Sequence, residues 1–247
     1  VATLGGFLFG YDTAVVSGAI NAIRDFLVIP FAGNSHGSVS SITGFTVSSA
    51  LIGCILGGAA AGFVSLRAGR KGGMMLAAIL FLLSGVGAAF PENLSFMGID
   101  PLVSFILYRI IGGIGIGLAS MLSPMYIAEI APAGIRGKLV SWNQFAIVSG
   151  ILIVYFVNWF IARHGDEQWN MTTGWRYMFL SGAIPSLLFI FLLFFIPETP
   201  RFLVLKLRND KALKVLGRTV GDEAEVHLKE ISSTLVEKSA PWLSFGA

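Results

Sequence analysis

Charged side chains are scarce in this sequence. Asp, Glu, Lys and Arg make up 13% of the 247 residues, while 55% are apolar, against about 25% charged residues in soluble domains. This composition excludes an ordinary soluble domain. The 17 basic residues outnumber the 14 acidic ones by three and are dispersed over short connections, which argues against a nucleic-acid partner.

Cysteine and catalytic motifs are also nearly absent. The single Cys54 excludes an internal disulfide, and it lies within an apolar run where a small packing residue fits. His36, His164 and His227 are scattered through connections and the tail, and there is no CxxC, HExxH or GxxxxGK[ST] pattern. We therefore expect no enzyme, no metal site and no cofactor.

The most prominent feature of the sequence is a series of long apolar runs. A helix needs about 20 residues to cross a hydrocarbon core of about 30 Å. Six runs reach that length, at 1–28, 42–64, 72–90, 102–130, 139–163 and 175–196. The sequence therefore predicts an all-α, polytopic membrane protein that spans a lipid bilayer, with a six-helix transmembrane domain over residues 1–196.

Residues 197–247 have a different character. They are polar and helix-prone, which predicts a linker of short cytoplasmic helices; a solvated linker is the alternative. The apolar ending APWLSFGA suggests the approach to a seventh span. Since residue 1 is valine within an apolar run, we expect a piece of a longer protein.

The basic residues of the connections predict an orientation. Lys and Arg gather at 65–71, at 131–138 and after 196, whereas 29–41, 91–101 and 164–174 have none. Because cytoplasmic loops carry an excess of Lys and Arg, the first set should be cytoplasmic. Both the N-terminus and the 197–247 segment should then lie in the cytoplasm.

Pairs of glycines four residues apart mark two of the spans. They are Gly53 with Gly57 and Gly58 with Gly62 in the second span, and Gly113 with Gly117 in the fourth. Such spacing lets helix backbones approach closely, so we expect these glycines to form packing faces.

Two opposite charges lie inside apolar runs. Asp12 is in the middle of the first span, and Arg109 is about seven residues into the fourth. A charge in hydrocarbon is costly and usually faces a partner or a water-filled path. At comparable depths the two can pair, and a carboxylate that gains and loses an arginine partner changes its proton affinity. This favours proton coupling; a permanent structural ion pair is the alternative.

The fifth span carries neutral amides and aromatic rings. Gln144 and Ile151 are seven residues apart and share a helix face. Amides beside aromatic platforms suit polyhydroxylated ligands, although an amide in a bilayer more often makes interhelical hydrogen bonds than ligand contacts.

The end of the fourth span carries a longer pattern. It resembles the signature of the sugar porter family of the major facilitator superfamily, and its positions are filled by Ile111, Gly113, Ile114, Gly117, Tyr126, Glu129 and Arg136. Residues 197–201, PETPR, and 174–176, GWR, are similar to further family elements. Gly69-Arg70-Lys71 resembles the end of a superfamily loop motif, but Leu66 replaces its aspartate.

The resemblance implies a fold, a location and roles. It is strongest to bacterial D-xylose–proton symporters of the cell inner membrane, with twelve helices in two halves and the sugar between them. The chain would be the N-terminal half, and its partners would be a monosaccharide, a proton and the missing C-terminal half. Asp12 would carry the proton beside Arg109, Gln144 would bind sugar, and Phe9 would line the cavity. A cytoplasmic gate would comprise Arg70, Glu129, Arg136, Glu198 and Arg201.

One departure bears on the substrate. Ile151 stands where the xylose symporters carry a second glutamine, as in glucose facilitators. The sequence therefore predicts proton-coupled symport of a monosaccharide, xylose or a related pentose or hexose, by alternating access. An uncoupled facilitator and a non-transporting sugar sensor stay as alternatives.

Overall fold

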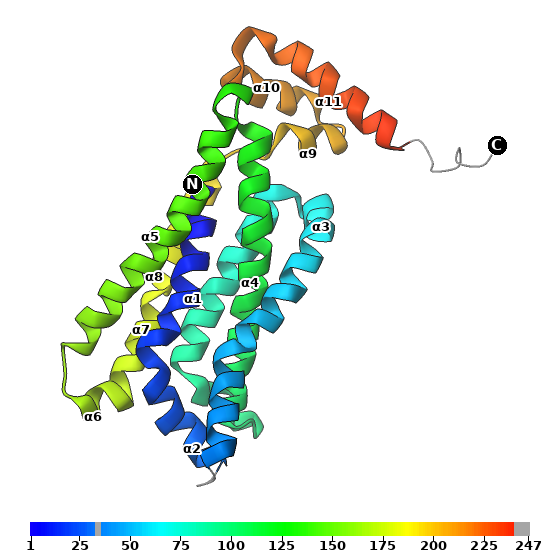
Figure 1. Ribbon diagram of the computed structural model, residues 1–247. Helices are drawn as coiled ribbons and strands as arrows, with labels where there is room; N and C mark the ends of the chain where they lie inside the picture. Colours follow the sequence, from blue (N-terminus) through cyan, green and yellow to red (C-terminus); the bar gives the residue numbers. More distant parts are fainter. Residues whose placement is uncertain (33–35, 240–247) are drawn as a thin grey trace.

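The computed structural model describes residues 1–32 and 36–239. These residues form a bundle of long helices, and three short helices cover one end of it (Figure 1). No strand occurs in the described ranges, which confirms the all-helical prediction. The APWLSFGA ending lies outside the described residues.

The helices follow the chain in a simple order. The first half of the bundle comprises α1 (Thr3–Ile23), the π-helical η1 (Arg24–Val28), α2 (Ile29–Ala32), α3 (His36–Ala89), η2 (Pro91–Met97) and α4 (Pro101–Ile130). The second half comprises η3 (Ala133–Ile135), α5 (Arg136–Ala162), α6 (Glu167–Trp169), η4 (Asn170–Gly174), α7 (Trp175–Ser181) and α8 (Ala183–Phe195). The end of the bundle is covered by α9 (Pro200–Leu205), α10 (Asn209–Thr219), η5 (Gly221–Glu223) and α11 (Ala224–Ser239).

Six membrane crossings result from five continuous apolar stretches. The stretches long and apolar enough to cross a bilayer are Thr3–Ala32, Ser38–Ala89, Pro101–Ile130, Arg136–Ala162 and Glu167–Phe195. The second has 52 residues, twice the length that one crossing needs. Its helix breaks at Gly69, whose φ of 82° and ψ of 178° are open to glycine but not to L side chains. The prediction of six spans is therefore confirmed.

Several spans extend further than the sequence predicted, and the first and the sixth show why. The first continues through the π-helical turn η1 to Ala32, beyond the expected end at residue 28. The sixth begins at Glu167, eight residues before the expected start at 175, because the Asp166 carboxylate caps it by accepting from Trp169 N–H at 2.7 Å. Hydropathy alone does not reveal such a cap.

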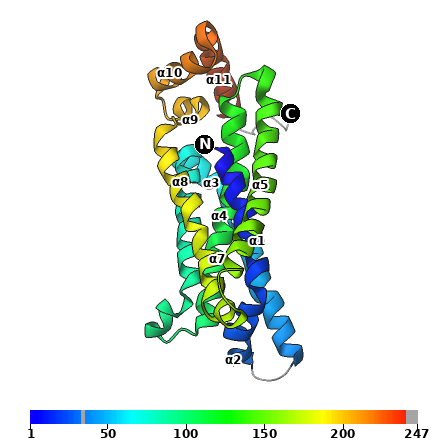
Figure 2. The ribbon, with the colours of Figure 1, turned by 90° about the vertical axis from the view of Figure 1, so that its left-hand side faces the viewer.

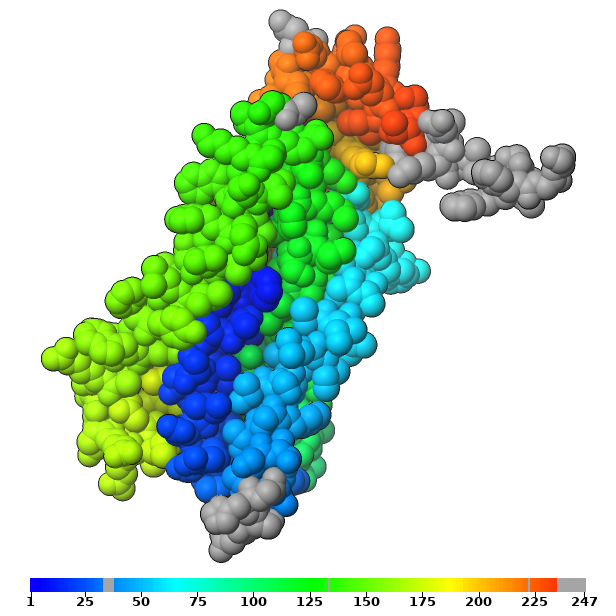
Figure 3. All heavy atoms as spheres, viewed as in Figure 1, coloured from blue at the N-terminus to red at the C-terminus, as the bar shows by residue number. Residues whose placement is uncertain are grey.

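The bundle packs as pairs of neighbours. α1 lies along α5, and α3 lies along α4; on the face drawn in Figure 3, α1 is visible between α5 and the first part of α3. α1 and α5 run parallel, since Gly10 packs on the Ile147 carbonyl and Asn158 donates to Val15 O at 3.1 Å. This register fixes which residues of the two helices lie at the same depth.

Glycines set the α3–α4 contact. A Cβ on Gly113 would collide with Ala50 O, and one on Gly53 would collide with Ile110 O, so the predicted close packing is confirmed there. The prediction was wrong for Gly62, where an added Cβ would have no atom within 4 Å. An added Cβ on Gly58 would also face open space, but the backbone nitrogen of Gly58 lies against Gly117 of α4.

The three short helices form their own small core. It contains Leu203, Val204, Ala212 and Val215, with Leu228 and Ile231 packed against it. Figure 2 shows these helices at the same end of the bundle as the first residues of α1.

Candidate functional site

Asp12 and Arg109 form an ion pair inside the bundle. Arg109 Nη1 of α4 donates to Asp12 Oδ2 of α1 at 2.9 Å, and Nη2 donates to the Asp12 backbone carbonyl at 3.4 Å. The Arg109 side chain is 2% exposed and that of Asp12 is 12% exposed. The pairing of Asp12 with Arg109 that the sequence predicted is therefore confirmed.

Apolar and aromatic side chains surround the pair. The guanidinium carbon of Arg109 lies 5.7 Å from the centre of the Phe179 ring. The Tyr11 hydroxyl is hydrogen-bonded to Ser181 Oγ at 2.7 Å, which ties α1 to α7 next to Asp12. Arg109 Nε has no hydrogen-bond partner in the described part of the chain. In such surroundings the attraction within the pair is strong, and so is the penalty for leaving either charge alone.

The predicted sugar-contacting residues lie on α1 and α5. Gln144 is exposed, whereas Ile151 and Phe9 are partly buried and pack against the bundle core. The parallel register of the two helices puts Ile151 near the depth of Asp12. Gln144 lies seven residues before Ile151 on α5, and is therefore roughly 10 Å closer than Ile151 to the end of the bundle that carries α9–α11. The Gln144 amide therefore lies on the exposed side of α5.

A second ion pair lies at the α9 end of the bundle. Arg70 Nη2 donates to Glu129 Oε1 at 2.7 Å, and its Nη1 donates to Ser65 O at 3.4 Å. The Arg70 and Glu129 side chains are 9% and 12% exposed. This bond joins the break in α3 to the last turn of α4, and it connects two of the residues that the sequence analysis assigned to a gate.

Glu198 holds the same break through backbone groups. Its carboxylate accepts from the backbone N–H groups of Arg70 (3.1 Å), Lys71 (3.2 Å) and Thr199 (2.9 Å). Lys71 Nζ in turn donates to Ile196 O at 2.8 Å. The sequence singled out Glu198 as a gate residue but gave no sign that its partners are backbone amides, because any residue can supply an N–H.

Arg136 and Arg201 stay outside these bonds. Both line a cavity of about 600 Å³ beside Arg70 and Glu129, yet no ion pair joins them to an acid in the described ranges. Glu129 Oε2 is buried and has no hydrogen-bond partner among the described residues. The structure thus brings the five predicted gate residues to one end of the bundle, and among the described residues it connects only Arg70, Glu129 and Glu198.

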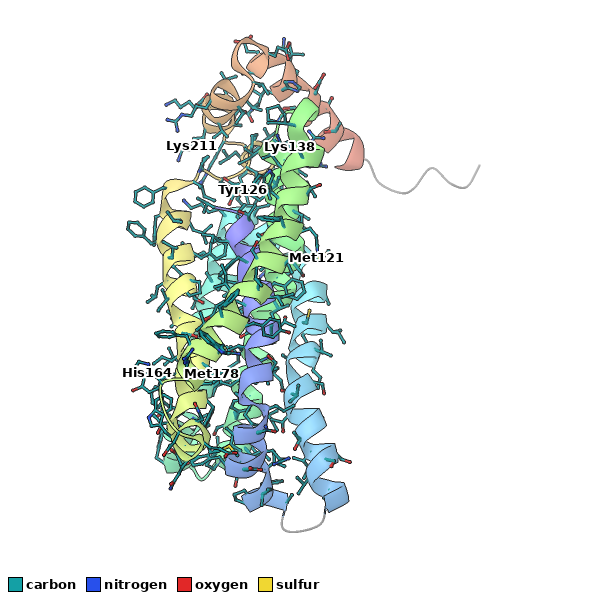
Figure 4. All side chains as sticks on the ribbon, turned by 60° about the vertical axis from the view of Figure 1, so that its left-hand side comes forward. Met121, Tyr126, Lys138, His164, Met178 and Lys211 are labelled. Atoms are coloured by element: carbon teal, nitrogen blue, oxygen red, sulfur yellow. The ribbon has the colours of Figure 1, made fainter. Side chains whose placement is uncertain are left out.

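Two further contacts escaped the sequence analysis. Tyr126, labelled in Figure 4 near the α9 end, donates its hydroxyl to Pro197 O at 2.8 Å. At the other end Arg176 Nη1 donates to Glu92 Oε2 at 2.9 Å and to Ala89 O at 2.8 Å. The Arg176 guanidinium holds the pKa of the Glu92 carboxyl below its ordinary value through these hydrogen bonds. Arg176 is part of the GWR element at 174–176 that the sequence analysis noted. The sequence did not predict Glu92 as the partner of Arg176, because that contact depends on how η2 packs against the bundle.

No metal site is found in the described residues, where no three His, Cys, Asp or Glu side chains gather closely enough to hold an ion.

Comparison with known proteins agrees with this architecture. The profile of the family described as sugar (and other) transporter matches residues 1–245. The D-xylose-proton symporter of Escherichia coli K12 is 53% identical over 244 residues, which cover 93% of this chain and 49% of the symporter. The glucose facilitated diffusion protein of Zymomonas mobilis is 39% identical over 218 residues, 88% of this chain and 46% of that protein.

A solved structure has the same fold. The E. coli xylose transporter in a partially occluded inward-open conformation superposes with a TM-score of 0.91 at 51% identity, over 96% of this chain and 58% of that one. The chain spans about half the length of the curated relatives it matches. With the family profile matched along nearly its whole length, this chain belongs to the sugar transporter family, and its six-helix bundle is an N-terminal half of the major facilitator fold.

Proposed function

We propose that the protein containing this chain moves a monosaccharide across a membrane together with a proton. The Asp12–Arg109 pair carries the proposal, since it places an ionisable carboxylate inside the bundle against a buried arginine. A relative that is 53% identical bears the name D-xylose-proton symporter, which supports coupling. The activity requires the other half of the fold, and that half is the partner of the exposed face of α1 and α5.

Coupling follows from the chemistry of the pair. In the present conformation Arg109 holds the Asp12 carboxylate in an ion pair. When a proton binds Asp12, the ion pair is lost and α1 and α4 are free to shift relative to each other. A movement that separates the two groups leaves the carboxylate without its cation, and a carboxylate without a neighbouring cation in general binds a proton more readily. Proton binding and conformation are thereby linked in both directions.

The cytoplasmic gate uses the second charge cluster. Arg70, Glu129 and Glu198 already tie α3, α4 and the start of α9 together. Arg136 and Arg201 line the adjacent cavity with their charges unpaired in the described residues, so they are available for acids of the other half. In this proposal the cluster closes the cytoplasmic side in one conformation and opens in the other.

The sugar would lie against the open face of α5. Gln144 offers an amide donor and acceptor there, and Phe9 and Ile151 contribute apolar surface. Because Ile151 supplies no hydrogen bond, we propose a monosaccharide of either pentose or hexose type as the substrate.

The proposed location is the cell inner membrane, with the N-terminus and residues 197–247 in the cytoplasm. The basic connections and the α9–α11 helices lie at one end of the bundle (Figure 1), as the positive-inside rule requires. Labelling of whole cells with an impermeant maleimide tests this. Phe96→Cys, in the exposed η2 connection, should react, and Lys211→Cys on α10 should not.

Sugar-induced proton uptake tests the symport itself. Addition of xylose or glucose to cells with the full-length protein should make an unbuffered medium more alkaline, and a protonophore should abolish sugar accumulation. The alternative is facilitated diffusion, which the identity to a glucose facilitated diffusion protein favours. Equilibrating uptake that ignores the protonophore, with no change in medium pH, would establish that alternative.

A further inference from the structure

A buried hydroxyl without a partner lies beside the Asp12–Arg109 pair. Ser84, on the second part of α3, is 1% exposed, and its Oγ has no hydrogen-bond partner among the described residues. A Cβ built on Gly112 would collide with Ser84 Oγ and would lie 3.7 Å from Asp12 Oδ2. Both oxygens therefore lie within 4 Å of one point on α4.

The unpaired state of this hydroxyl is unusual for a helix. A serine in the interior of a helix commonly donates to a backbone carbonyl of the preceding turn. Ser186 does so to Gly182 O at 2.8 Å, and Ser49 does so to Thr46 O at 2.8 Å. A buried hydroxyl that bonds nothing is costly, so Ser84 gains in any state that gives it a partner.

The protonated form of Asp12 needs such a partner. An ionised carboxylate only accepts hydrogen bonds, but a protonated one has an O–H that must donate. Arg109 has donors alone and cannot accept this bond. The Tyr11 hydroxyl is already bonded to Ser181. Ser84 Oγ is the buried hydroxyl near Asp12 that makes no hydrogen bond, as donor or as acceptor, to the described residues.

There is also a little space beside the carboxylate. A cavity of about 10 Å³ borders Asp12 and is lined from α3 by Phe81 and Gly85, the latter next to Ser84. On its other sides α7 and α8 contribute Phe179 and Ser186. The ionisable groups around Asp12 are Arg109 of α4 and Tyr11 of its own helix; α3, α7 and α8 face it with uncharged side chains.

We propose that Ser84 is a positioning residue that accepts the hydrogen bond of the protonated Asp12 carboxyl and so stabilises the proton-loaded state. The proton stays on Asp12, and Ser84 changes its partner but not its charge. The inference rests on the proposed proton-coupled transport. It adds that Ser84 influences the pH midpoint of sugar-driven proton uptake.

The pH profile of sugar-driven proton uptake by the full-length protein tests the inference. Ser84→Ala removes the acceptor, so the midpoint should move to more acidic pH by about 0.5–1 unit, the size of one hydrogen bond. Ser84→Cys keeps the volume with a weaker acceptor and should shift the midpoint in the same direction by less. If the alanine variant fails to fold, the cysteine variant carries the test.

Ser104→Ala is the matched control. Ser104 on α4 is also fully buried with an unpartnered hydroxyl in the described chain, so its loss should leave the midpoint unchanged. A Ser84→Ala midpoint equal to those of the wild type and Ser104→Ala overturns the inference and leaves symport intact. A wild-type protein that takes up no protons with sugar overturns the proposed function and the inference with it.

Discussion

Arg109 and Asp12 join α4 to α1 through a 2.9 Å ion pair in which the arginine is nearly inaccessible to solvent. The two residues are 97 positions apart in sequence, so this contact exists only in the assembled bundle. The two charges differ in what happens when one is removed. A lone carboxylate can neutralise itself by binding a proton, whereas a lone arginine stays charged.

This asymmetry predicts the order of stabilities of two variants. Asp12→Ala leaves a buried uncompensated guanidinium and should cost about 3–5 kcal/mol. Arg109→Met keeps a long side chain, and Asp12 can then bind a proton, so the loss should be smaller, about 1–2 kcal/mol. Melting temperatures in detergent check the order. An Arg109→Met variant that is as unstable as Asp12→Ala, or less stable, would contradict it.

The packing of α3 on α4 should respond to one methyl group. Gly113→Ala places a Cβ against Ala50 O, and such overpacking should cost about 1–3 kcal/mol. Gly62→Ala is the control, because that position is open and a helical alanine is about 0.5–1 kcal/mol better than glycine. Thermal unfolding of both variants measures the contrast. Equal melting temperatures would mean that α3 and α4 are not in close contact at Gly113.

The break in α3 should depend on glycine for two separate reasons. At Gly69 the backbone has a φ of 82° and an added Cβ would collide with Glu198. Gly221 also has a positive φ, of 66°, but its surroundings are open. Gly221→Ala should therefore cost about 1 kcal/mol from conformation alone, and Gly69→Ala about 2–4 kcal/mol from conformation and collision together. Similar losses would show that Glu198 does not occupy the break.

How far the sequence predicted this structure depends on the kind of contact. Membrane spans are local features of length and apolarity, so all six were predictable. The Asp12–Arg109 pair was predictable because two opposite charges in otherwise apolar helices have few other partners. Glu198 was named, but its bonds to the backbone of residues 70 and 71 were not, since backbone amides look alike in every sequence. Ser84 carries no signal at all, because a single serine in an apolar run is unremarkable until α4 lies against it.

The Glu92–Arg176 contact predicts a pH dependence of stability. Hydrogen bonds from Arg176 lower the pKa of Glu92 below its ordinary value of 4.5. A lowered folded-state pKa means that the contribution is complete above the unfolded value and disappears as the pH falls through the folded one. Because Glu92 is 42% exposed, we expect at most about 1 kcal/mol.

Melting curves between pH 3 and pH 7 measure this contribution. The wild type should exceed Glu92→Gln in stability at neutral pH, and the two should converge in acid below the ordinary pKa of a glutamate. In the background of Arg176→Gln, Glu92→Gln should have little effect at any pH. A difference that grows as the pH falls would contradict the sign of the shift.

The central claim is that Asp12 couples sugar movement to protons, and Asp12→Asn separates these two events. Asparagine keeps an acceptor for Arg109 but binds no proton. In liposomes with the full-length protein, the variant should exchange labelled sugar by counterflow at a rate near that of the wild type. It should also lose accumulation of sugar driven by a pH gradient.

Asp25→Asn is the control, because Asp25 pairs with Arg24 at the surface of η1 and lies outside the buried pair; it should accumulate sugar normally. The decisive measurement is therefore gradient-driven sugar accumulation by Asp12→Asn relative to Asp25→Asn. The account predicts that accumulation falls to the equilibrium level in the Asp12 variant alone. Accumulation by Asp12→Asn that equals that of the control would contradict it.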